Sequence, residues 1–67
     1  MNLNANHHKI LGIFSDDNNA YLSSRDVGEF IPELKISTVI NLLIDLVYMG
    51  YAYKKVIGGV AAYKIRV

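Results

Sequence analysis

The sequence predicts an α+β fold in which three short helices precede a two-stranded β-hairpin, in one domain spanning residues 1–67. Three observations support this prediction. Apolar residues recur at helical spacing in three segments that polar or proline-containing stretches separate. Residues 51–67 are rich in β-branched and aromatic types on both sides of Gly58-Gly59, a pair that favours a tight hairpin turn. The chain has 67 residues and no cysteine, so a small apolar core must stabilise it without disulfides.

The first helix is expected over His7–Phe14, after a loose leader at residues 1–6. Its apolar stripe consists of Ile10, Leu11, Ile13 and Phe14. Residues 16–19 are Asp-Asp-Asn-Asn and end the helix, because such side chains hydrogen-bond locally and favour turns. The adjacent His7 and His8 point about 100° apart on a helix, so we expect both to be solvated and not to bind a metal. Residues 20–22 suffice only for a stub of strand.

The second helix is expected over Ser24–Phe30. Ser23 is a good N-cap, and Asp26 three residues later makes a variant of the capping box. Pro32 ends the helix, since the residue before a proline avoids helical angles. The side chains predicted to face inward are Val27, Phe30 and Ile31.

The third helix is expected from Thr38 to Met49, with Ser37 as N-cap and Gly50 in the left-handed conformation that often follows a helix. One side carries the expected core residues Val39, Leu42, Leu43, Leu46 and Met49. A narrow polar stripe consists of Thr38, Asn41, Asp45 and Tyr48. A further apolar stripe consists of Ile40, Ile44 and Val47, and two interpretations account for it: the helix is central and covered by its neighbours, or the stripe is partly exposed and forms a dimer contact.

The hairpin strands are expected over Tyr51–Ile57 and Val60–Val67. A two-residue turn at Gly58-Gly59 fixes their register. The expected pairs are Ile57 with Val60, Val56 with Ala61, Lys55 with Ala62, Lys54 with Tyr63 and Tyr53 with Lys64.

Charge and aromatic residues are unevenly distributed. Residues 1–50 carry three basic and six acidic residues, whereas residues 51–67 carry four basic residues and no acidic one. The basic end indicates either an anionic partner or lysines that keep exposed strands soluble. Four of the five tyrosines lie in or beside the hairpin, where they either stack on bases of single-stranded nucleic acid or fill a core and cross-strand contacts.

Two segments resemble the winged helix-turn-helix family. Residues 22–27, Leu-Ser-Ser-Arg-Asp-Val, resemble the start of that family's second helix. Residues 37–51 open with Ser-Thr-Val, contain a Leu-x-x-Leu core and close with a glycine, as its recognition helix does. The resemblance covers roughly residues 9–66, and it implies a winged-helix fold with the C-terminal hairpin as the wing.

The resemblance implies a DNA-binding transcription regulator. Ser37, Thr38 and Asn41 would then face the major groove of double-stranded DNA, and Arg25 and Lys35 would lie near phosphates. The wing lysines Lys54, Lys55 and Lys64 would flank the minor groove. We expect a homodimer that places two copies of the third helix in successive major grooves.

Two departures from the family pattern favour another role. The third helix contains no Lys or Arg, and Asp45 on its polar stripe would repel phosphate. The wing tip is apolar where DNA-binding wings usually carry basic residues. The alternative is a protein-interaction or dimerisation module without direct DNA binding, whose interface residues would be Ile40, Ile44, Val47, Ile57 and Val60.

Other classes of function find no support in the sequence. No arrangement of nucleophile, acid and base suggests catalysis, and no motif suggests a cofactor or metal. The longest dense apolar stretch, residues 39–47, is too short and too polar to cross a bilayer. No secretory signal is visible, and we expect a cytoplasmic protein.

Overall fold

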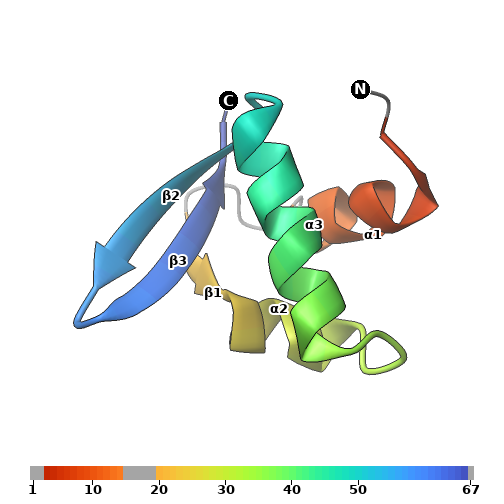
Figure 1. The fold of residues 1–67 in the computed structure, drawn as a ribbon, viewed down its shortest axis with the longest axis horizontal. Coiled ribbons are helices and arrows are strands. Elements are labelled where there is room, and N and C mark those ends of the chain that lie inside the picture. The colour runs from red at the N-terminus through yellow and green to blue at the C-terminus, as the bar shows by residue number, and fades with distance from the viewer. Residues whose placement is uncertain (1–2, 15–19, 67) are drawn as a thin grey trace.

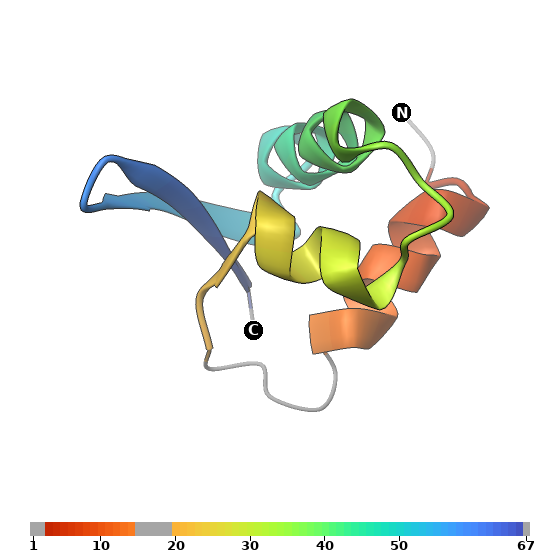
Figure 2. The same ribbon diagram turned by 90° about the horizontal axis from the view of Figure 1, so that it is seen from below.

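A computed structural model describes residues 3–14 and 20–66 of the chain. Within these ranges it contains three helices and a three-stranded antiparallel sheet, which confirms the α+β class (Figure 1). The elements in chain order are α1 (Ala5–Phe14), β1 (Leu22–Ser23), α2 (Ser24–Phe30), α3 (Ile36–Tyr48), β2 (Ala52–Ile57) and β3 (Val60–Ile65). The helices group together and the hairpin projects away from them (Figure 2). This arrangement is compatible with a winged-helix-like layout.

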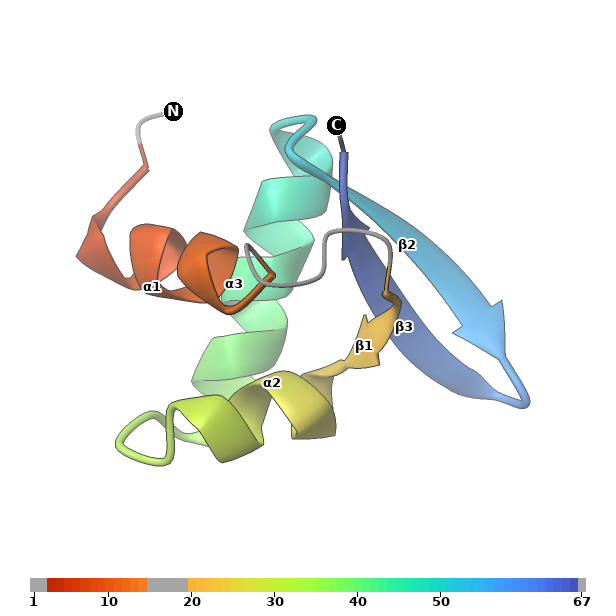
Figure 3. The same ribbon diagram turned by 180° about the vertical axis from the view of Figure 1, so that it is seen from behind.

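The sheet has the strand order β1-β3-β2. All five predicted pairs of the β2–β3 hairpin are confirmed, from Tyr53↔Lys64 to Ile57↔Val60. Gly58 and Gly59 both take positive φ, as the two-residue turn requires. The short strand expected at residues 20–22 forms at Leu22–Ser23 and is the third strand of the sheet (Figure 3). Leu22 pairs with Tyr63, and Ser23 pairs with Ala62.

The N-terminus of α2 forms as predicted. The Ser23 hydroxyl accepts a hydrogen bond from the Asp26 backbone N–H at 3.1 Å, and the Asp26 carboxylate accepts one from the Ser23 backbone N–H at 3.1 Å. This reciprocal capping box satisfies two backbone donors that a helix start leaves without partners.

The predicted start of α3 is wrong. The helix begins at Ile36 with Lys35 as N-cap, and no side chain caps it. The reason is packing: a Cβ at Gly28 of α2 would lie 3.3 Å from the Ile36 side chain, so Ile36 sits directly against α2. Because of this contact the helix starts before Ser37, which lies in its first turn.

Helix α1 begins at Ala5, earlier than the expected start at His7. Asn4 caps it, because its side-chain oxygen accepts hydrogen bonds from the backbone N–H groups of Asn6 and His7. In return, the His7 Nδ1 accepts from the Asn4 backbone N–H at 3.0 Å. Part of the expected leader therefore forms the helix cap, and a histidine takes the place that Glu or Gln fills in the usual capping box.

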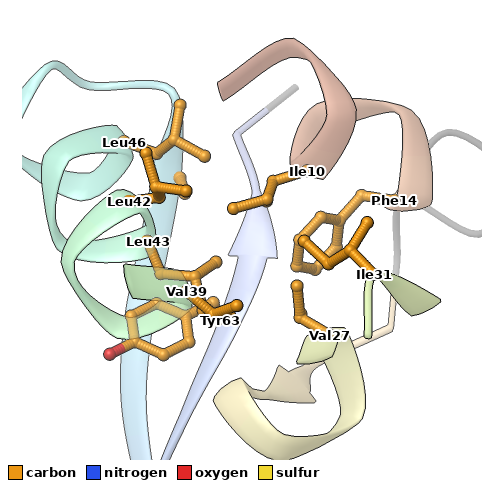
Figure 4. Close-up of a cluster of buried hydrophobic side chains, with 10 residues drawn as sticks. Ile10, Phe14, Val27, Ile31, Val39, Leu42, Leu43, Leu46 and Tyr63 are labelled. Carbon is orange, nitrogen blue, oxygen red and sulfur yellow. The ribbon is translucent and has the colours of Figure 1, made fainter. Parts of the chain in front are cut away.

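The core lies between the three helices and the sheet, where the side chains of α1, α2 and α3 point toward one another above Tyr63 (Figure 4). Its largest fully buried side chains are Phe14, Ile10, Leu43, Leu46, Val27 and Val39. The predicted inward position of Phe30 is wrong, since that side chain is 65% exposed. Ile31 leaves helical angles at the end of α2 and enters the core, so Phe30 remains outside.

None of the helices in the described ranges has the length and apolar character that spanning a membrane requires.

Candidate nucleic-acid interface

Helix α3 presents one face to solvent, and we call it the outward face. Its residues are Ser37, Asn41, Ile44 and Tyr48, which recur at helical spacing opposite the buried side. Ser37 and Asn41 are exposed, whereas Thr38 is half-buried. Two of the three side chains expected in the major groove therefore lie on the outward face, and they occupy its N-terminal half.

The C-terminal half of the outward face is apolar or aromatic. Tyr48 is 82% exposed and Ile44 is 46% exposed. The stripe of Ile40, Ile44 and Val47 is partly exposed. Val47 packs against the core and Ile40 is half-buried, while Ile44 is about half exposed. The dimer contact expected of this stripe stays a prediction.

Two predicted phosphate contacts lie near the helix starts. Arg25 is exposed in the first turn of α2, and Lys35 is exposed immediately before α3. The α2 start and the hairpin tip border one shallow hollow, which Ser23, Ser24, Arg25 and Val60 line. Arg25 thus borders a hollow beside the hairpin tip, and Lys35 is exposed at the start of α3.

The hairpin lysines do not share one surface. Side chains alternate between the two faces of a strand, and the Lys54↔Tyr63 pair shares the core face of the sheet with buried Ala52. Lys55 lies on the opposite face, which we call the outer face, and the Tyr53↔Lys64 pair lies there as well. A ligand that contacts Lys54 on the side of the helices would therefore leave Lys55 and Lys64 on the far side.

His7 is buried at 3% exposure, so its expected solvation is wrong. Since Nδ1 accepts from the Asn4 N–H, the proton is on Nε2, which donates to Asp45 Oδ2 at 3.2 Å. The pair ties the start of α1 to the middle of α3. It also holds the Asp45 carboxylate on the α1 side of α3.

No local pattern in the sequence indicates the His7–Asp45 contact, because the two residues are far apart in the chain and meet only after α1 packs on α3. A second missed feature is the aromatic contact at Tyr21, whose ring centroid lies 5.7 Å from Lys55 Nζ and 5.6 Å from Lys64 Nζ. Strand alternation in the predicted register already placed both lysines on one face. The missing step was the third strand, which brings Tyr21 beside them.

No site for a metal emerges from residues 3–14 and 20–66, since no three His, Asp or Glu side chains there gather closely enough to hold an ion. Neither a protein-family model nor a curated protein sequence matches this chain.

Proposed function

We propose that this domain is a winged-helix transcription regulator that binds double-stranded DNA, with the N-terminal half of α3 in the major groove. The observation that carries the proposal is the placement of Ser37 and Asn41, both exposed and one turn apart on the outward face. Residues near the start of a recognition helix contact base edges in this docking geometry. An Asn side chain can bond an adenine edge through two hydrogen bonds.

Exposed cations at the start of α3, at the start of α2 and on the hairpin would supply the sequence-independent attraction to phosphate. Lys35 precedes the helix, Arg25 lies at the start of α2, and Lys54 is on the sheet face turned toward the helices. Lys55 and Lys64 lie on the other face, so the proposal assigns the wing contact to Lys54. A cytoplasmic location, as expected from the sequence, suits this role.

The homodimer expected from the sequence remains part of the proposal. An outward face inserted in a major groove is not available for contact between copies. The hairpin tip is a candidate for that contact, because Ile57 and Val60 are both about half exposed there. Sedimentation at high micromolar concentration tests this point, and a monomer would remove the dimer.

The test is binding to mixed-sequence duplex DNA by fluorescence anisotropy, from about 50 to 200 mM salt. We expect affinity to fall steeply with salt. Lys35→Ala and Lys54→Ala should each reduce the salt slope by about 1. Lys9→Ala, an equal loss of charge on α1, is the matched control and should leave affinity unchanged.

A second candidate function follows from the apolar half of the outward face. Ile44 and Tyr48, together with Ile57 and Val60 at the hairpin tip, are among the exposed apolar residues that a protein-interaction or dimerisation module would use. A protein partner on the outward face would cover Asn41, so the two functions exclude each other there. If duplex DNA fails to bind at low salt and Ile44→Ser abolishes self-association, the second candidate is the function.

A further inference from the structure

The outer face of the sheet is turned away from the core and from Lys54. Its residues on the hairpin are Tyr53, Lys55, Ile57, Val60, Ala62 and Lys64, by the observed register. Ser23 of β1 joins them through its pairing with Ala62. Tyr21, one alternation before Ser23, lies on the same face and contacts Lys55 and Lys64.

Two tyrosine rings lie on this face with a lysine between them. Antiparallel pairing places Tyr53 opposite Lys64, and the ring of Tyr21, which directly precedes β1, contacts Lys64 from the other side of β3. Adjacent strands are about 4.8 Å apart, so the backbones that carry the two tyrosines are about 10 Å from each other across the sheet. Tyr21 is 38% exposed and Tyr53 is 48% exposed. Ala62 lies in the middle of the face, where its small side chain projects little above the sheet.

The face is positively charged. Arg66 follows β3 and lies over the Tyr53 ring, with its Cζ 5.8 Å from the ring centroid. Of the acidic residues that the structure describes, none lies in a strand, and neither described ion pair involves a cation of this face. Lys55, Lys64 and Arg66 therefore rest on aromatic rings without a carboxylate partner in the described part of the chain.

We propose that this outer face binds single-stranded nucleic acid, with unpaired bases stacking on Tyr21 and Tyr53 and the backbone phosphates bound by Lys55, Lys64 and Arg66. Aromatic rings interleaved with cations are what sequence-tolerant single-strand binding requires, since every base offers a flat face and every nucleotide a phosphate. A paired duplex hides its base faces and would use only the cations. The arrangement of base platform, cation and base platform across three strands thus favours the single strand.

The cation contacts seen on the rings do not obstruct this ligand. Lysine and arginine side chains are long and flexible, and contacts of this kind at exposed rings are weak. When a base stacks on Tyr21 or Tyr53, the cation can swing to the phosphate beside it. The ring contacts keep the cations near the face until a strand arrives.

The experiment titrates the full chain with a fluorescein-labelled oligothymidylate and, separately, with a duplex. Stacking contributes about 1–3 kcal/mol per base, a five- to 150-fold change in Kd. We expect Tyr53→Ala to weaken oligothymidylate binding by a factor in that range, and Tyr53→Phe to restore it. Phe30→Ala is the matched control, because Phe30 is an exposed aromatic residue on α2, and it should have no effect.

The neighbouring lysines separate this proposal from duplex binding. Lys55→Ala should weaken binding of the single strand and leave binding of the duplex unchanged. Lys54→Ala should weaken binding of the duplex and leave binding of the single strand unchanged. Circular dichroism of each variant checks that the fold is retained. Three results would each overturn the single-strand site. They are no binding of oligothymidylate at low salt, equal losses of oligothymidylate affinity from Lys54→Ala and Lys55→Ala, and equal losses of that affinity from Tyr53→Ala and Phe30→Ala. None of these outcomes bears on whether α3 binds duplex DNA through Asn41.

Discussion

His7→Ala should be among the most destabilising substitutions outside the apolar core. It removes the acceptor for the Asn4 backbone N–H, the donor to Asp45, and most of a side chain that is 3% exposed. The first bond contributes about 1 kcal/mol, and the bond to a charged group about 1.5 kcal/mol. The second value is at the low end of the range for hydrogen bonds to charged groups, because the Asp45 side chain is 42% exposed and can be rehydrated.

Lost packing of the imidazole adds to these terms, so we expect a total of about 2–4 kcal/mol. A domain of this length has a free energy of unfolding of about 3–10 kcal/mol. The substitution would therefore remove a large share of the stability and lower Tm by about 10 °C or more.

Urea unfolding followed by circular dichroism measures this loss. His8→Ala is the matched control, because His8 is exposed on the same turn and should cost under about 0.5 kcal/mol. Asp45→Ala and the double variant complete a cycle that isolates the pair, with an expected coupling of about 1 kcal/mol. Equal costs for the two histidines, or additive effects of His7→Ala and Asp45→Ala, would refute the reasoning.

Three further stability predictions use the same unfolding assay. Phe14→Ala should lower the free energy of unfolding by about 3–5 kcal/mol because the Phe14 side chain is fully buried. Phe30→Ala should lower it by less than about 0.5 kcal/mol. Similar losses would mean that the exposed position of Phe30 is wrong. Gly50→Ala should cost about 1–2 kcal/mol because φ is 86° there, whereas Gly12→Ala should stabilise helix α1 by about 0.5–1 kcal/mol, since an added Cβ meets nothing within 4 Å. Ser23→Ala should cost about 1 kcal/mol through loss of the capping box, and an unchanged midpoint would show that the box contributes nothing.

The parts of the fold that the sequence predicted depend on local chemistry. The cap of α2 needs only Ser23 and Asp26, three residues apart, and forms in the predicted place. The hairpin register needs only the two-residue glycine turn, which fixes every pair that follows it. Gly50 takes its predicted left-handed conformation for the same reason, since a helix end and its cap are neighbours in the chain.

The predictions that failed depend on contacts between distant segments. Ile36 extends α3 because it meets Gly28 on another helix, and no local pattern contains that contact. His7 is buried because α1 lies across α3 and brings it to Asp45. The predicted group of hairpin lysines is split between two surfaces for a similar reason. Lys54 and Lys55 are adjacent in sequence and lie on opposite faces of the sheet. Only the position of the helices decides which of these faces points away from the core.

Asp45 provides a test of where DNA lies on α3. It follows Asn41 by one helical turn. Its contact with His7 holds the carboxylate on the α1 side of α3, but the negative charge would still oppose phosphates that pass within about 10 Å of it. Two unit charges about 10 Å apart in water interact by about 0.4 kcal/mol, which is close to a twofold change in Kd. Asp45→Asn keeps an oxygen that can accept the hydrogen bond from His7, so the fold should persist while this repulsion disappears.

We therefore expect Asp45→Asn to raise duplex affinity by about twofold at low salt, and the gain to shrink at higher salt because the interaction is screened. Glu29→Gln, an equal change of charge at an exposed position on α2, is the control in the same anisotropy titration. A larger gain at Asp45 than at Glu29 would mean that the DNA backbone passes near the outward face. Equal gains would mean that only net charge matters, and the placement of α3 in the groove would then lose its electrostatic support.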